Sequence, residues 1–308
     1  MRVFADVAEL RRWRSEARAP LGFVPTMGAL HAGHLSLVEI ARRRCATVVV
    51  SVFVNPLQFA PGEDLARYPR DLPGDVDKLA QAGVDAVFAP EAERFVADGL
   101  TTTVSVAGLT GPLEGVFRPG HFDGVTTIVT KLLNVVQPDV AVFGEKDYQQ
   151  LAVIRRMVDD LDLPVEIVAA PIVRDDDGLA LSSRNRYLSA DERARALVLS
   201  RALRDAARTW SGDADAARAV LRRTLGAVAG IDVDYADVVD EHTLVALHGD
   251  GHHRARAVLA ARVGATRLID NLLLALEHSD HAARRPRALR DGPVERAHLG
   301  DAAELEEA

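Results

Sequence analysis

Apolar positions in the first 170 residues alternate between short strand-like runs and longer stretches with helical spacing. The run Thr47 to Val54 is almost unbroken and rich in β-branched residues, as expected of a parallel strand buried on both faces. Further strands are predicted at 21–25, 86–89, 102–106, 140–143 and 165–168, and helices at 7–17, 35–44, 73–82, 122–136 and 147–161. Alternating strands and helices predict an α/β fold, a Rossmann-like parallel sheet with helices on both faces.

The pattern changes near residue 188. Ser189 and Glu192 have the spacing of a capping box that starts a helix. Two helices are expected at about 190–209 and 213–229, followed by strands at 231–239, 256–263 and 266–274. We therefore predict a Rossmann-like ligand-binding domain at 1–187 and a smaller C-terminal α+β domain at 188–276 that covers the site as a lid. Residues 277–308 lose periodicity and are predicted to form a disordered tail.

Composition narrows the class of protein. The net charge of −8 argues against a nucleic-acid binder, which needs a basic surface. No apolar run approaches the ~18 residues of a membrane span, and the N-terminus does not have the pattern of a signal peptide. The single cysteine, Cys45, has no partner for an internal disulfide. A cytoplasmic protein without membrane contact is expected.

Lysine is rare in a chain that is otherwise rich in arginine. Only Lys78, Lys131 and Lys146 are present. Positions that keep lysine under such a bias are enriched for sites that need a compact ammonium group, which draws attention to Lys146 and Lys131.

Polar side chains follow three of the predicted strands. His31 and His34 come after the first, Asn55 and Gln58 after the second, and the segment 144–147 after the strand at 140–143. In open parallel sheets ligands bind beyond the carboxyl ends of the strands, so these side chains are expected to share one site.

The segment His31-Ala32-Gly33-His34 lies between a strand and a helix. Two imidazoles three positions apart share a helix face, and the helix N-terminus attracts anions, so a nucleotide phosphate site is indicated. A structural turn with two incidental histidines is the alternative, as is a zinc site, although no third ligand with suitable spacing is evident. The pattern His-x-Gly-His is typical of adenylate-forming nucleotidyltransferases of the class I aminoacyl-tRNA synthetase type.

Those enzymes have a second phosphate-binding loop later in the chain, and residues 177–185 fit it. Ser182 and Ser183 offer hydroxyls, and Arg184 offers a guanidinium that binds phosphate through two nitrogens. By itself this segment also suits an Asp-Gly turn followed by a polar loop. Together with the histidine motif, the functional interpretation is favoured.

The chain resembles the pantothenate synthetase family, enzymes that condense pantoate with β-alanine. The resemblance rests on PTMGALHAGH at 25–34, FVNPLQF at 53–59, YPR at 68–70, RPGHFDGV at 118–125, FGEKDYQQL at 143–151, DGLALSSRNRYL at 177–188 and RLIDN at 267–271. It implies a pantoate–β-alanine ligase that forms pantoyl-adenylate from ATP, releases pyrophosphate, and then yields pantothenate and AMP. It further implies Mg²⁺ with the ATP, and a homodimer, with which the apolar strand 47–54 is compatible.

The resemblance also implies roles for individual residues. The catalytic residues would be His34, His31, Lys146 and Arg184. The ATP-binding residues would be Met27, Gly28, His31, His34, Gly144, Glu145, Lys146, Asp147, Val173, Leu181, Ser182, Ser183 and Arg184. Pantoate and β-alanine would be bound by Gln58, Gln150, Asn55 and Arg118. The Pro- and Gly-rich segment 59–71 is expected to close over the site, because acyl-adenylates hydrolyse in water.

Other interpretations remain open at this point. Asn55 and Gln58 also suit loop capping, Gln150 a solvated helical turn, and Lys131 a structural lysine. Another nucleotidyltransferase of the same fold would lack the paired glutamines, and a non-catalytic nucleotide-binding protein would not need the histidines, the lysine and the Ser-Ser-Arg loop together.

Overall fold

Six parallel strands form the larger sheet of the computed structural model, which describes residues 1–96 and 100–276. Their order is β1-β4-β3-β2-β5-β6. The strands are β1 (Arg2–Phe4), β2 (Leu21–Thr26), β3 (Thr47–Val52), β4 (Ala86–Phe88), β5 (Val140–Gly144) and β6 (Glu166–Ala170). From β2 the chain adds β3 and β4 on one side of the sheet, and it then returns to add β5 and β6 on the other side of β2. The switch point between β2 and β5 is where such sheets bind ligands.

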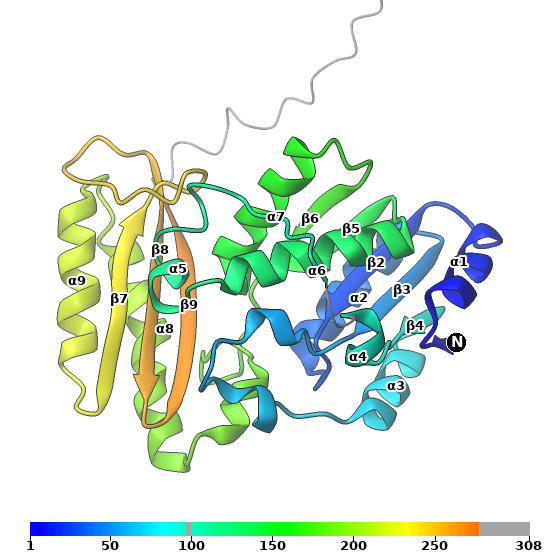
Figure 1. The fold of residues 1–308 in the computed structure, drawn as a ribbon. Coiled ribbons are helices and arrows are strands. Elements are labelled where there is room, and N and C mark those ends of the chain that lie inside the picture. Colours follow the sequence, from blue (N-terminus) through cyan, green and yellow to red (C-terminus); the bar gives the residue numbers. More distant parts are fainter. Residues whose placement is uncertain (97–99, 277–308) are drawn as a thin grey trace, which may run out of the picture. The chain divides into compact units, whose positions relative to one another are not determined.

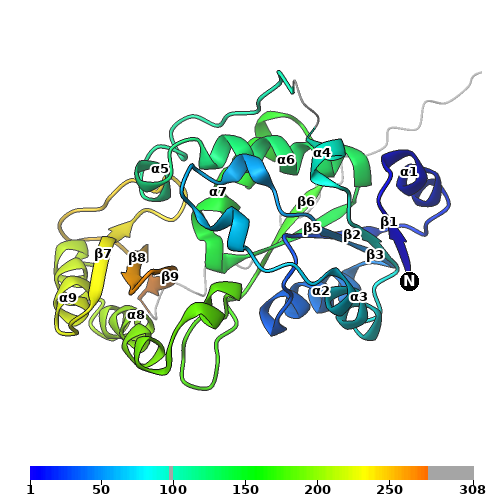
Figure 2. The same cartoon turned by 60° about the horizontal axis from the view of Figure 1, so that its bottom comes forward.

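Helices cover both faces of this sheet, as predicted. Figure 2 shows α4 (Ala92–Phe95) and α6 (His121–Val136) above it, and α2 (Ala32–Arg44) and α3 (Leu72–Gln81) below. Successive strand residues project to opposite faces, so Phe23 joins the core under α6 whereas Val24 joins the core over α2. The first core also contains residues of α1 (Val7–Ser15) and α7 (Tyr148–Asp160).

A second sheet is antiparallel, in the order β7-β8-β9. Its strands are β7 (Ile231–Val239), β8 (Arg254–Val263) and β9 (Thr266–Ala275), and α8 (Ala190–Arg208) and α9 (Ala214–Gly226) pack on one face (Figure 1). Its other face adds Val258 to the first core. The predicted capping box is present, since the Ser189 and Glu192 side chains each accept a hydrogen bond from the other's backbone N–H. The predicted α+β part is therefore confirmed.

The domain boundaries stay predictions. Packing joins Met1–Leu276 into one unit, which gives no independent support for a division at 187/188. The predicted disordered tail, 277–308, lies outside the described residues.

Two strands differ from the prediction. Residues 102–106 are not a strand, although their β-branched run suggests one. Side chains of α6 bind this backbone instead: Val104 N–H donates to Thr127 Oγ1, and the Thr126 hydroxyl donates to the Val104 carbonyl. Conversely, β1 was not predicted, because only three residues pair at the sheet edge.

Strand β3 occupies the sheet interior, between β2 and β4, with its residues buried from Thr47 to Ser51. Buried side chains of an interior strand are not available for contact with a second chain, so this strand gives the expected homodimer no support. Within the described ranges, no helix is long and apolar enough to cross a membrane.

Candidate active site

A cavity opens at the carboxyl ends of β2, β3 and β5, at the switch point of the sheet. It is lined by all the predicted site residues except Gly28 and Glu145. An adjoining cavity on the side of the small sheet shares Arg118, His121, Lys146, Asp147, Gln150, Ser182 and Arg184. The sequence motifs, far apart along the chain, therefore meet at one place.

The two histidines stand at the start of α2. His31 is the N-cap residue, and its ring lies 4.0 Å from that of His34, centroid to centroid. The His31 backbone N–H donates to His34 Nδ1 at 3.3 Å, so a neutral His34 carries its proton on Nε2. Burial, and to a smaller extent the neighbouring His31, lowers the pKa of His34 to about 3. Burial, and to a smaller extent the charge of Lys146, lowers the pKa of His31 to about 4. Both rings are neutral in the free protein near pH 7, with a hydrogen-bond donor on His34.

Asp75 fixes the loop that leads into this histidine pair. Its carboxylate is fully buried and accepts from the backbone N–H groups of Ala29 at 2.7 Å and Leu30 at 2.8 Å. Gly28, at φ +81°, packs so closely that an added Cβ would lie 2.9 Å from Asp75 Oδ2. Gly28 therefore shapes the loop through its backbone conformation and does not line the cavity.

Lys146 lies on the short 3-10 helix η3 (Glu145–Asp147), which follows β5. Its side chain is 20% exposed, and its ammonium lies 3.9 Å from the Asp147 carboxylate, beyond hydrogen-bond length. Its charge thus remains available to an anionic ligand. By contrast, Lys131 stands over the Phe95 ring, with Nζ 4.9 Å from the centroid, and does not line the cavity, which supports its structural interpretation.

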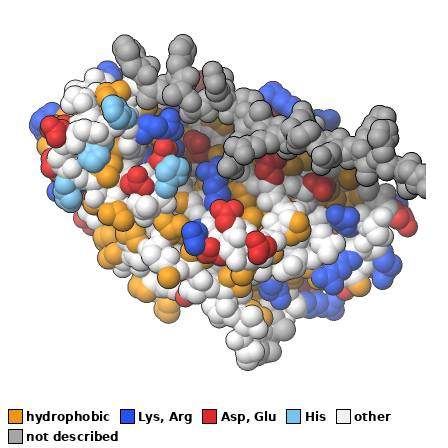
Figure 3. Space-filling view, turned by 90° about the horizontal axis from the view of Figure 1, so that it is seen from above, with side chains coloured by type: hydrophobic (Ala, Val, Ile, Leu, Met, Phe, Trp, Pro, Cys, Tyr) orange, Lys and Arg blue, Asp and Glu red, His pale blue; other side chains and the backbone are white. Residues whose placement is uncertain are grey.

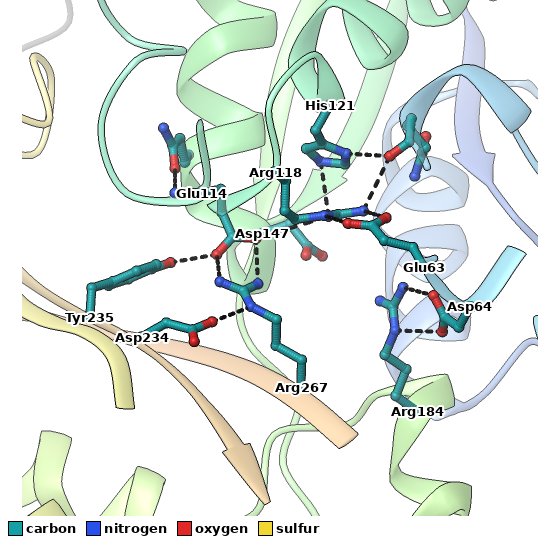
Figure 4. Close-up of polar contacts among 12 residues, drawn as sticks. Glu63, Asp64, Glu114, Arg118, His121, Asp147, Arg184, Asp234, Tyr235 and Arg267 are labelled. Carbon is teal, nitrogen blue, oxygen red and sulfur yellow. Dashed lines mark hydrogen bonds and ion pairs between the residues drawn. The ribbon is translucent and has the colours of Figure 1, made fainter. Parts of the chain in front are cut away.

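Arg184 is held by a carboxylate. It lies on the 3-10 helix η4 (Ser183–Tyr187), and its guanidinium donates to both carboxylate oxygens of Asp64 at 2.9 Å (Figure 4). Asp64 belongs to η2 (Asp64–Arg67), within the predicted closing segment 59–71. Tyr68 OH and Ser183 Oγ, 3.3 Å apart, add a second contact between the same two loops.

Arg118 is likewise paired. Its guanidinium donates to both Glu63 oxygens, at 2.7 and 2.8 Å, and to the Gln58 carbonyl at 3.2 Å. His121 Nδ1 lies 2.9 Å from the same carbonyl, and its Nε2 lies 3.2 Å from Arg118 Nη1 (Figure 4). Donation from Nδ1–H to the carbonyl leaves Nε2 to accept from Arg118, so His121 is a neutral connector as well as a helix N-terminal residue.

The two amide side chains that follow β3, those of Asn55 and Gln58, have different roles. Asn55, 3% exposed, donates to Gln58 Oε1 and the Gly124 carbonyl, both at 3.0 Å, and its Oδ1 accepts from Leu57 N–H. These bonds hold η1 (Pro56–Gln58) in place, so Asn55 orients Gln58. Gln58, with Nε2 3.1 Å from Met27 Sδ, and Gln150 both line the cavity.

A second buried network joins α5 (Glu114–Phe117) to the small sheet. Arg267 donates to both Glu114 oxygens, at 2.7 and 2.8 Å, and also to Asp234, while the Tyr235 hydroxyl donates to Glu114 at 2.9 Å (Figure 4). Burial by itself raises the pKa of Glu114, but the hydrogen bonds and charge of Arg267, with smaller contributions from Tyr235 and Arg118, keep this pKa below its usual range, so the carboxylate stays charged. Of these residues only Arg267 belongs to a sequence motif, RLIDN at 267–271. Its contact with Glu114 could not be predicted, because the two are 153 positions apart.

Exposed histidines gather elsewhere. Figure 3 shows histidine side chains on one part of the surface, and those of the loop between β7 and β8 include His242, 84% exposed, and His248, 75% exposed. His253 is exposed and His252 is half-buried. Across residues 1–96 and 100–276, no cluster of three His, Cys, Asp or Glu side chains is arranged to hold a metal ion, so the zinc alternative gains no third ligand.

The neutral histidines predict acid sensitivity of the fold. Burial lowers the pKa of His121 to about 4, alongside the values for His31 and His34. In the unfolded chain they take up protons near pH 6.5, so below that pH the unfolded state binds more protons. The free energy of unfolding should be fully retained above pH 6.5 and fall as the pH drops toward 4. Denaturant titrations between pH 7.5 and 4.5 measure it. His121→Gln should flatten the slope and His242→Gln should not; a free energy independent of pH over this range would contradict the prediction.

Comparison with known proteins gives a consistent result. The sequence model of the family described as pantoate-beta-alanine ligase matches residues 2–273. Pantothenate synthetase 1 of Bradyrhizobium diazoefficiens is 51% identical over 280 residues, 89% of this chain and 98% of that protein. The pantothenate synthetase of Thermus thermophilus is 54% identical over 276 residues, 88% and 99% of the two chains.

Solved structures agree. A crystal structure of the Thermus thermophilus pantothenate synthetase matches with a TM-score of 0.86 and 52% identity, over 90% of this chain and 100% of that one. The pantoate-beta-alanine ligase of Francisella tularensis, complexed with βγ-ATP and β-alanine, matches with a TM-score of 0.74 and 33% identity, over 89% and 97%.

Proposed function

The chain belongs to the pantoate–β-alanine ligase family, and on this premise we propose how its cavity carries out the family's reaction. The enzyme condenses pantoate with β-alanine at the expense of ATP, through a pantoyl-adenylate intermediate, and yields pantothenate, AMP and pyrophosphate. The observation that carries the proposed residue roles is the meeting of two histidines, Lys146, the Ser182–Arg184 segment and two glutamines in one cavity.

In the first step, a pantoate carboxylate oxygen attacks the α-phosphorus of ATP, and the bond to pyrophosphate breaks. Such transfers need aligned reactants and charge stabilisation, and no covalent enzyme intermediate. We assign the neutral His34 Nε2–H and the Lys146 ammonium to the negative charge on the transferring phosphate. The α2 N-terminus adds its dipole. Ser182, Ser183 and Arg184 hold the β- and γ-phosphates, and His31 contacts the nucleotide.

The remaining ATP contacts follow the cavity lining. Gly144 and Asp147 are assigned to the ribose and purine side, together with the backbone of Met27, Val173 and Leu181. Gly28 and Glu145 support this wall from outside the lining, Gly28 through the loop held by Asp75 and Glu145 through its backbone carbonyl.

Pantoate is assigned to the part of the cavity between the two glutamines. Gln58 and Gln150 offer amides to its hydroxyls and carboxylate, while Asn55 holds Gln58 in place. Val125, Ile128, Val129 and Phe143 line the same cavity and provide an apolar surface for the two methyl groups of pantoate. Arg118 contributes by fixing the Gln58 backbone.

In the second step, the β-alanine amine attacks the acyl carbon of pantoyl-adenylate, and AMP leaves. The adenylate must be kept from water until then. The contacts from Asp64 and Tyr68 to the 182–184 loop support a closing role for segment 59–71. The small sheet, through Arg267 and Asn271, supports the predicted covering role of the C-terminal part.

We also propose Mg²⁺ as part of the nucleotide substrate. Asp147 lines the cavity, but no cluster of metal-binding side chains is found in the described residues. This fits an ion that arrives bound to phosphate oxygens and water, as is usual for Mg²⁺ with ATP. A homodimer is proposed from the family resemblance, with an interface outside β3. The cytoplasm is proposed as the location, because it supplies ATP.

The decisive test is ATP–pyrophosphate exchange without β-alanine. Exchange of labelled pyrophosphate into ATP should require both pantoate and Mg²⁺ and should stop when the ion is chelated. Exchange with other hydroxy acids but not with pantoate would overturn the assigned substrate. Exchange that persists in excess chelator would overturn the role of Mg²⁺.

A further inference from the structure

Two adjacent polar residues on β9 are buried. Asp270 is 4% and Asn271 3% exposed, in the strand of the small sheet that lies nearest the parallel sheet (Figure 1). Successive residues of a strand project to opposite sides, so the two side chains reach different neighbours. Because buried polar groups are costly without partners, those neighbours are informative.

Asn271 binds the turn that carries Lys146. Its side-chain amide donates to the carbonyls of Glu145, at 2.9 Å, and Lys146, at 3.0 Å. Its Oδ1 accepts from Arg256 at 2.6 Å, and the Arg256 guanidinium lies 3.5 Å from the ring centroid of Tyr148, the first residue of α7. The turn is thus held from the small sheet at two of its three carbonyls.

Asp270 binds the hairpin that precedes the other phosphate-binding segment. Its two carboxylate oxygens accept hydrogen bonds from the Arg174 guanidinium at 2.6 and 2.9 Å. Arg174 also donates to the Gly178 carbonyl at 3.3 Å. Arg174 forms a β-bridge with Ala180, and Leu181 N–H bonds to the Val173 carbonyl. The chain continues from this hairpin directly into the segment that contains Ser182 and Arg184.

We propose that Asp270 and Asn271 are positioning residues that set the spacing between Lys146 and the Ser182–Arg184 segment. The proposal rests on the phosphate-binding roles assigned above. Both segments include short 3-10 helices, and neither belongs to a sheet. The dipeptide on β9 binds the first segment directly and binds the hairpin that leads into the second. A displacement of about 1 Å from productive geometry can cost ~10²-fold in rate.

Asn271→Asp isolates this role. The aspartate has the shape of asparagine and keeps an oxygen facing Arg256, while it places a carboxylate oxygen against the two carbonyls in place of the donor. We expect kcat/KM for ATP in pantoate-dependent exchange to fall at least ~10-fold, with KM for pantoate changed less than ~2-fold. Asp270→Asn should show the same ATP-specific effect, and it decides the matter should Asn271→Asp fail to fold. The matched control is Asn134→Asp, an exposed position on α6.

A double-mutant cycle separates positioning from general stability. On a Lys146→Ala background, Asn271→Asp should lower the rate less than ~2-fold further, because its effect passes through the lysine. Independent multiplication of the two losses, or equal effects on ATP and pantoate, would overturn the proposal. A Lys146→Ala enzyme with an unchanged rate would overturn the lysine's role and the positioning with it. A slow Lys146→Ala enzyme beside an unaffected Asn271→Asp enzyme would overturn the positioning alone.

Discussion

Replacing Lys146 by alanine should lower the rate of pantoate-dependent ATP–pyrophosphate exchange at least ~10²-fold, the usual size of a lost charge-stabilising group. Lys146 lines both adjoining cavities, and its ammonium lies 3.9 Å from the Asp147 carboxylate. The ammonium is therefore available to stabilise the negative charge that develops on the phosphates. Lys146→Arg should restore little, since a planar guanidinium does not reproduce a compact point charge.

Lys131→Ala is the matched control for this experiment. It removes a lysine of α6 that stacks on Phe95 outside the cavity, so it should affect stability more than rate. A loss of less than threefold in Lys146→Ala would remove this residue from the mechanism.

Replacing His34 by alanine should cost a similar ~10²-fold in the adenylation rate. The His31 N–H occupies His34 Nδ1, which leaves the protonated Nε2 as the group that can face the transferring phosphate. His34→Gln places an amide N–H near the Nε2 position, so it should recover part of the rate. Both rates are to be measured by exchange at saturating ATP and pantoate.

His242→Ala serves as the control, because this histidine is 84% exposed on the loop after β7. Equal rates for His34→Gln and His34→Ala would show that the Nε2 donor has no role. A wild-type rate in His34→Ala would exclude the residue altogether.

The fold could be predicted from the sequence wherever an element buries a regular pattern. The run 47–54 predicted β3 because a central parallel strand is apolar on both faces. Residues 102–106 have similar β-branched content, but Thr126 and Thr127 bind their backbone groups. Such competition from side chains of a distant helix leaves no periodic signal in the segment itself.

The candidate site was predictable where motifs follow strand ends, and less so where partners are distant. His31, Lys146 and Ser182 were found because each belongs to a recognisable local pattern. Asp64 and Asn271 were given no role, although Asn271 belongs to the RLIDN motif, because their contacts to Arg184 and Glu145 span 120 and 126 positions. For Asp75 there was a weak signal, a carboxylate one turn before the buried Leu79 in an amphipathic helix.

The Asp64–Arg184 pair has a consequence for how the enzyme cycles. With the proposed role of Arg184, the Asp64 carboxylate pairs with the guanidinium that is assigned to phosphate and neutralises its charge. Phosphate that binds Arg184 competes with Asp64, so nucleotide binding and the Asp64–Arg184 contact are linked equilibria, whereas the Tyr68–Ser183 contact can still hold segment 59–71 closed. The same competition assists the departure of pyrophosphate, because the carboxylate returns as the inorganic anion leaves. The competition from Asp64 therefore weakens ATP binding and, for the same reason, speeds the release of pyrophosphate.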